Sequence, residues 1–127
     1  MVEKEIWRRW MEQAEADFGK AKVLRDSGDF DGVIFYSQQA IEKGLKALRF
    51  RKDMSFLKIH DLVKLASDFN LPEEFFSGLD DLSSFYIEAR YCLGIEDGIP
   101  ANKFILEDAE KFIKITEDVL KWIKERV

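Results

Sequence analysis

Two sets of residues in this chain have the chemistry of a binding or catalytic site. His60 is the only histidine of the 127 residues, and an imidazole can exchange a proton near neutral pH or bind a phosphate. Arg90 lies close to Tyr86 and Tyr91 in the sequence, and a guanidinium can hold an anion through two hydrogen bonds while an aromatic ring stacks on a base. We therefore treat these four residues as candidates for a nucleotide or phosphate site.

A run of basic residues extends the candidate site. Between Lys43 and Lys58 the chain has six basic residues and one acidic residue, Asp53. The basic ones are Lys43, Lys46, Arg49, Arg51, Lys52 and Lys58. On a helix, Gln39, Lys43 and Lys46 fall at steps of four and three and so share one strip. We therefore add Lys43 and Lys46 to the candidate phosphate-binding residues.

Each candidate also has an ordinary structural role. His60 could cap or pack at the start of a helix, and Arg90 could pair with a buried carboxylate such as Glu42. Glu42 and Lys46 have the i,i+4 spacing of a common helical ion pair, so the basic strip can also be a solvated helix face. The sequence leaves both interpretations open.

The sequence contains little else for a catalytic or metal centre. A single cysteine, Cys92, cannot form an internal disulfide or a cysteine-based zinc site, and a lone histidine excludes two-histidine metal motifs. Paired acidic residues at adjacent helical positions point about 100° apart and make poor metal ligands. These pairs are Asp80-Asp81, Glu96-Asp97 and Glu107-Asp108. We expect no metal and no cofactor, and the sequence does not favour a self-contained enzyme.

The composition favours one globular domain spanning residues 1–127. Hydrophobic residues make up 46% and charged residues 35%, with 2 Pro and 7 Gly, which argues against disorder and against loop-rich all-β folds.

No apolar run approaches the ~18 residues of a membrane span, and the mixed-charge start lacks the apolar stretch of a secretory signal. We therefore expect a cytoplasmic protein without membrane contact. The net charge of −5 argues against general duplex binding.

Hydrophobic spacing predicts helices and almost no strand. The expected helices cover residues 5–25, 30–50, 60–69, about 72–91 and about 107–126. Trp7, Trp10 and Phe18 lie at helical spacing and are expected in the core, and Gly44 in mid-helix favours close approach of another helix. Short connections favour antiparallel neighbours. The predicted fold is therefore all-α, an up-down bundle of four or five helices.

Three segments together resemble the HEPN family of small helical domains. Residues 29–48 contain an aromatic residue, Gln-Gln-Ala, Glu-Lys and Lys-Ala in the order of the family's second helix. Residues 59–62, Ile-His-Asp-Leu, are similar to the opening of its third helix, and residues 86–91, Tyr-Ile-Glu-Ala-Arg-Tyr, to the end of its fourth. With Ala109 and Trp122 on the last helix, the resemblance covers almost the whole chain.

The resemblance implies an all-helical fold and a role with nucleotides or RNA. Many family members look like ribonucleases or like partners of minimal nucleotidyltransferases. The ribonuclease branch uses an Arg followed after four to six residues by a His, and before His60 those positions hold Asp53, Met54 and Ser55. We therefore expect a chain without the conventional ribonuclease motif, in which folding could still bring His60 and Arg90 together.

The residues and the resemblance support three hypotheses for the function. The first is a non-catalytic HEPN domain, expected to be a homodimer, that binds a nucleotide or an RNA end and works beside a minimal nucleotidyltransferase in a toxin–antitoxin-like pair. The second is an unconventional HEPN ribonuclease that uses His60 and Arg90. The third is a pure protein-interaction module. The first two depend on the imidazole and the guanidinium meeting at one place in the fold.

Overall fold

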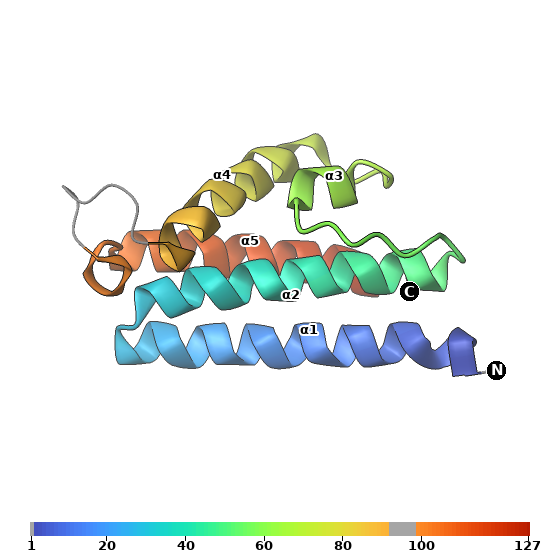
Figure 1. The fold of residues 1–127 in the computed structure, drawn as a ribbon, viewed down its shortest axis with the longest axis horizontal. Helices are drawn as coiled ribbons and strands as arrows, with labels where there is room; N and C mark the ends of the chain where they lie inside the picture. Colours follow the sequence, from blue (N-terminus) through green and yellow to red (C-terminus); the bar gives the residue numbers. More distant parts are fainter. Residues whose placement is uncertain (1, 92–98) are drawn as a thin grey trace.

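The computed structural model describes residues 2–91 and 99–127, with side chains from residue 5 onward, and this part of the chain is helical without a strand (Figure 1). The elements are α1 (Val2–Ser27), α2 (Phe30–Arg51), α3 (Leu62–Ala66), α4 (Glu73–Arg90), a short 3₁₀ helix η2 (Pro100–Asn102) and α5 (Leu106–Lys124). The all-α prediction is confirmed. None of these described helices is both long and apolar enough to cross a membrane. Cys92 and the Glu96-Asp97 pair lie outside the described residues.

The third helix is shorter than expected. The spacing predicts a helix over residues 60–69, whereas α3 covers Leu62–Ala66. Asp61 accounts for its start, because its carboxylate accepts a hydrogen bond from the Lys64 amide at 3.1 Å and so caps the helix. His60 therefore lies in the connection before α3, where its side chain is 72% exposed.

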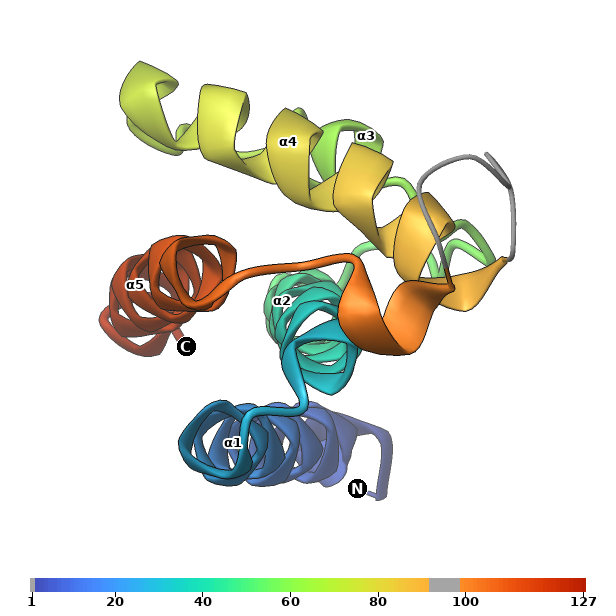
Figure 2. The same cartoon turned by 90° about the vertical axis from the view of Figure 1, so that its left-hand side faces the viewer.

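α2 is the central helix of the bundle. In Figure 2 it lies among α1, α5 and the α3–α4 pair, and it contacts all four of these helices. Its buried apolar side chains include Val33, Ile34, Ile41, Leu45 and Leu48. A Cβ atom at Gly44 would lie 2.9 Å from Leu120 Cδ2 and 3.1 Å from Ile123 Cδ1. The predicted close approach of another helix at Gly44 is therefore confirmed, and that helix is α5.

Aromatic side chains fix α4 against α5. Phe112 of α5 is fully buried, and its ring centroid lies 5.0 Å from that of Phe85 of α4 in an edge-on arrangement. The ring of Phe104, which precedes α5, lies 5.8 Å from that of Phe85. Since α4 also carries Tyr86 and Arg90, these contacts help to determine where those two residues lie on the bundle.

The aromatic residues of α1 are buried to different extents. Phe18 lies in the core and is 7% exposed. Trp7 and Trp10 are only partly buried and pack against the edge of the core. The ring of Trp10 lies 5.8 Å from Phe50 and 5.9 Å from Phe56. The end of the bundle where α1 begins and α2 ends is therefore rich in partly exposed aromatic rings.

Candidate functional site

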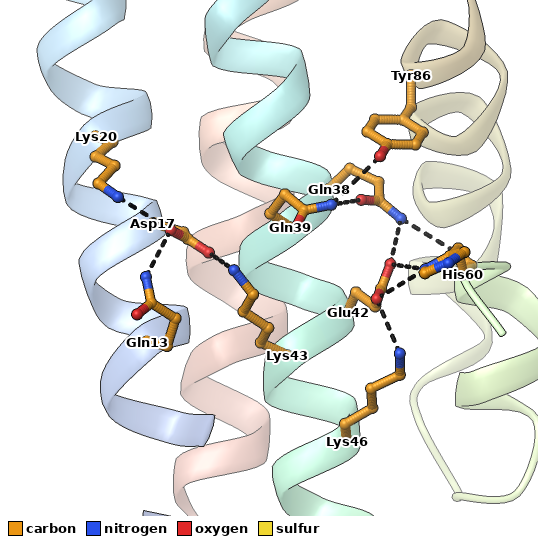
Figure 3. A network of polar contacts seen from close by, with 10 residues as sticks. All are labelled: Gln13, Asp17, Lys20, Gln38, Gln39, Glu42, Lys43, Lys46, His60 and Tyr86. Atoms are coloured by element: carbon orange, nitrogen blue, oxygen red, sulfur yellow. Dashed lines mark hydrogen bonds and ion pairs between the residues drawn. The ribbon is translucent and has the colours of Figure 1, made fainter. Parts of the chain in front are cut away.

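Three segments bring most of the candidate residues together around α2 (Figure 3). After α2 ends, the chain runs back along this helix before α3 begins (Figure 1), which returns His60 to the middle of α2. The C-terminal half of α4 carries Tyr86 and Arg90 and contacts α2. The side chains that connect these segments come from α2 itself: Gln38, Gln39 and Glu42.

The imidazole of His60 is oriented by a buried carboxylate. Its Nδ1 lies 3.1 and 3.0 Å from the two carboxylate oxygens of Glu42, whose side chain is only 7% exposed. Because a carboxylate can only accept, Nδ1 carries the hydrogen and donates. The other ring nitrogen, Nε2, makes no hydrogen bond to the described residues. In the neutral ring, Nε2 therefore offers its lone pair to solvent or to a ligand.

Lys46 supports this carboxylate from inside the protein. Its ammonium lies 2.9 Å from Glu42 Oε2, and its side chain is only 5% exposed. The same ammonium lies 5.4 Å from the ring centroid of Phe56 and 5.9 Å from that of Trp10. Lys46 is thus enclosed by a carboxylate and two rings, so it acts on the site through Glu42.

Glu42 stays charged because its hydrogen bonds outweigh its burial. Gln38 Nε2 donates to Glu42 Oε1 at 3.1 Å and also to the backbone carbonyl of His60 at 3.0 Å. Burial acts to raise the pKa of Glu42, since it disfavours the charged form. The hydrogen bonds from Lys46, His60 and Gln38 and the ammonium charge act in the opposite direction and hold this pKa below its usual value. At neutral pH the carboxylate therefore keeps all three donors in place.

A continuous set of hydrogen bonds joins this carboxylate to α4. Gln39 Nε2 donates to Gln38 Oε1 at 3.0 Å and lies 3.3 Å from the hydroxyl oxygen of Tyr86. Arg90 Nη1 donates to the same hydroxyl oxygen at 3.1 Å. His60 and Arg90 therefore belong to one network of polar contacts. We call it the His60–Arg90 network; its members are Gln38, Gln39, Glu42, Lys46, His60, Tyr86 and Arg90.

The α4 end of this network is exposed and aromatic. The guanidinium of Arg90 lies 5.4 Å from the ring centroids of both Tyr86 and Tyr91, and Tyr91 is 50% exposed. The alternative pairing of Arg90 with Glu42 is not observed, and no carboxylate of the described residues pairs with this guanidinium. Its remaining N–H groups are available to an anion from solvent.

Lys43 lies apart from the network. Its ammonium pairs with Asp17 of α1, whose side chain is 2% exposed. Asp17 also accepts a hydrogen bond from Gln13 at 3.0 Å and lies 3.6 Å from the ammonium of Lys20. Figure 3 shows these residues on the α1 side of α2, whereas the imidazole lies on the α3 side. The cluster closes the α1–α2 interface, and Lys43 has no part in the His60–Arg90 network.

The structure thus separates the six candidates into three groups. It joins His60, Tyr86 and Arg90 in one network with Tyr91 beside it, and it places Lys46 inside that network and Lys43 on the other side of α2. Gln38 and Glu42 connect the network although neither was a candidate. Glu42 has i,i+4 spacing with Gln38 on one side and with Lys46 on the other, and this spacing is the signal that could have found both residues. Within the described part of the chain, no group of three His, Cys, Asp or Glu side chains is placed to hold a metal ion.

This arrangement defines a small all-helical bundle whose central helix links an exposed imidazole to an exposed guanidinium. Comparison with known protein families agrees with this class of small all-helical bundles. A family model described as the HEPN domain matches residues 7–127, and the chain belongs to the HEPN family.

Two solved structures and one further relative match this chain over most of their length. The crystal structure of TT1696 from Thermus thermophilus has a TM-score of 0.89 and 26% identity, covering 95% of this chain and 98% of the other. The crystal structure of ST0689, an archaeal HEPN homologue, has a TM-score of 0.81 and 26% identity, covering 94% and 95%. A protein of Methanocaldococcus jannaschii named "Putative toxin MJ1304" is 26% identical, covering 91% of this chain and 84% of its own. The predicted family and fold class are confirmed.

Proposed function

We propose that this HEPN domain is non-catalytic and binds the phosphate of a nucleotide or of an RNA end at the His60–Arg90 network. Arg90 donates two hydrogen bonds to phosphate oxygens, the imidazolium form of His60 donates a further one from Nε2–H, and Tyr91 stacks on the base. The observation that carries the proposal is the unbroken set of hydrogen bonds from His60 to Arg90. It holds two exposed groups in fixed positions, which lowers the entropic cost of binding a ligand between them.

The biological setting that we propose is a toxin–antitoxin-like pair. The name of the Methanocaldococcus jannaschii relative, "Putative toxin MJ1304", supports this setting. The resemblance to the HEPN family supports a minimal nucleotidyltransferase as the second protein of the pair and a homodimeric state for this chain. Co-purification with such a partner, without any effect of nucleotide, would instead support a pure protein-interaction module.

The binding proposal is tested by replacing Arg90. Arg90→Ala is expected to weaken binding of ATP at least about tenfold, because a hydrogen bond to a charged group contributes roughly 1.5–3 kcal/mol. Isothermal titration calorimetry of the wild type and the variant measures the change. Arg9→Ala is the matched control, since Arg9 is an exposed arginine of α1 outside the network. An absence of binding at millimolar nucleotide, or equal weakening by both variants, contradicts the proposal.

One observation favours a second candidate, an unconventional ribonuclease. The buried Glu42 carboxylate orients the His60 imidazole and leaves Nε2 available, which is the arrangement of a general base. If the chain cleaves RNA, His60→Ala is expected to lower the rate about a hundredfold or more. Incubation of purified protein with tRNA, followed by denaturing electrophoresis, measures cleavage. Cleavage at the same rate in wild type and variant indicates a contaminating nuclease and removes this candidate.

A further inference from the structure

Only part of the basic run between Lys43 and Lys58 is neutralised inside the molecule. Three of its cations pair with carboxylates: Lys43 with Asp17, Lys46 with Glu42 and Arg49 with Asp68. Arg51 and Lys52 form no ion pair with any described residue. Arg51 is the last residue of α2 and Lys52 follows it, and each lines a separate surface cavity. This part of the run is not used by the His60–Arg90 network.

The cavity at Arg51 is electrically balanced. It has a volume of about 390 Å³ and is lined in part by Trp7, Arg8 and Arg51. The two guanidinium groups lie 5.3 and 5.9 Å from the ring centroid of Trp7. The same lining contains two carboxylates, those of Glu5 and Asp53. The opposite charges offset one another, so this cavity has no electrostatic preference for an anion.

The cavity at Lys52 has an excess of positive charge. Its volume is about 370 Å³, and it is lined by Lys52, Asp68, Phe69, Asn70, Trp122 and Arg126. The carboxylate of Asp68 accepts a hydrogen bond from Arg49, whose side chain is only 6% exposed and which also donates to the Ser55 carbonyl at 2.9 Å. Asp68 is therefore compensated within the protein. Lys52 and Arg126 pair with no carboxylate of the described residues.

Arg126 is held in position by Trp122. Its guanidinium carbon lies 3.8 Å from the indole ring centroid, and its Nη1 donates to the Trp122 backbone carbonyl at 2.9 Å. These contacts leave other N–H groups of the guanidinium available. Lys52 and Asn70 line the same cavity, and an ammonium and a side-chain amide are both hydrogen-bond donors. The lining thus combines two cations, one amide and a stacked indole.

We propose that this cavity binds a phosphate group. A phosphate presents several acceptor oxygens and a double negative charge, which match a guanidinium fork, an ammonium and an amide donor. The cavity lies at the end of the bundle where α2 and α5 terminate, whereas α4 terminates with Arg90 toward the other end (Figure 1). It is therefore a second anion site, and it does not depend on the function proposed for the His60–Arg90 network.

Titration with inorganic phosphate, followed by ¹H–¹⁵N NMR of the full chain, tests the proposal. Saturable shifts are expected at the indole Nε1–H of Trp122 and at the backbone amide of Asn70. Arg126→Gln and Lys52→Gln are each expected to weaken the affinity about tenfold, since each removes a charged hydrogen-bond donor. The matched control is Lys121→Gln, which removes an exposed cation from the last turn of α5 without changing the cavity lining.

Several outcomes overturn the proposal. Chemical-shift changes that do not saturate with phosphate show a general charge effect. Equal loss of phosphate affinity in Lys121→Gln and in Arg126→Gln shows the same. Loss of the same shifts in Arg90→Ala shows that phosphate binds at the His60–Arg90 network instead. Parallel titrations with adenosine monophosphate and with a short RNA bearing a 5′-phosphate identify the source of the phosphate. Of inorganic phosphate, adenosine monophosphate and the RNA, the one that binds with the highest affinity identifies the chemical class of the physiological ligand.

Discussion

Glu42→Ala is expected to lower the free energy of unfolding by about 3–5 kcal/mol, because removing one partner of a buried ion pair leaves the other charge buried and uncompensated. The stranded charge is the ammonium of Lys46, whose side chain is 5% exposed. Urea unfolding at pH 7, followed by circular dichroism, measures the loss. Glu110→Ala, which removes an exposed carboxylate of α5, is expected to change stability by less than about 0.5 kcal/mol.

The double variant Glu42→Ala with Lys46→Met identifies the cause of this loss. Removing the buried ammonium as well is expected to recover part of the stability, since an apolar pair of similar size costs less than a lone charge. If the double variant is less stable than Glu42→Ala alone, the ammonium is not the source of the cost.

The pH dependence provides a second check. The pKa of Glu42 is lowered in the folded protein from the ordinary value of 4.5, so its stabilising effect is complete above about that pH and is lost as the pH falls through the lowered value. The stability difference between wild type and Glu42→Gln should therefore narrow as the pH falls below 4.5. A difference that grows on acidification contradicts the assigned direction of the pKa shift.

Phe112→Ala is expected to lower the free energy of unfolding by about 3–5 kcal/mol, because it removes a fully buried ring and leaves a cavity. The ring packs edge-on against Phe85 of α4 at 5.0 Å, so its loss also weakens the contact that fixes α4. Chemical denaturation measures the change in stability. NMR shifts of the Tyr86 and Arg90 amides report whether the C-terminal half of α4 has moved.

Phe56→Ala is the control for this prediction. Phe56 is stacked on Phe50 with ring centroids 5.7 Å apart, but it is 44% exposed. Less apolar area returns to water when it is truncated, so the loss of stability should be clearly smaller than for Phe112. Equal losses of stability in Phe56→Ala and Phe112→Ala would contradict the prediction, because the half-exposed ring would then contribute as much as the buried one.

The helices could be predicted because their apolar residues follow a strict helical spacing. The spacing predicts a helix over residues 30–50, and α2 covers Phe30–Arg51. α3 was less predictable, because apolar spacing continues on both sides of it while its start is set by the Asp61 cap. Local spacing therefore locates a helix better than it locates the ends of a short one.

The site was only partly predictable because α2 is central. Lys43 and Lys46 share one strip in the sequence, but α2 has neighbours on several sides, so nearby positions meet different partners. The Glu42–Lys46 pair follows from i,i+4 spacing alone. The pairing of Lys43 with Asp17 depends on how α1 lies against α2, and the hydrogen bond from Gln39 to Tyr86 depends on how α4 lies against α2.

The connection between α2 and α3 has a consequence for how this family can diverge. Glu42 lies about 14 Å back along the axis from Arg51 at 1.5 Å per residue, and the connection from Arg51 to His60 can extend to about 30 Å. Because the connection is longer than the distance that it spans, it tolerates insertions and deletions without straining the helices. The connection before His60 can absorb such length changes, so the imidazole keeps its place beside the Glu42 carboxylate. Homologues can therefore differ in the length of this connection while they keep both the contact between the histidine and the carboxylate and the hydrophobic core.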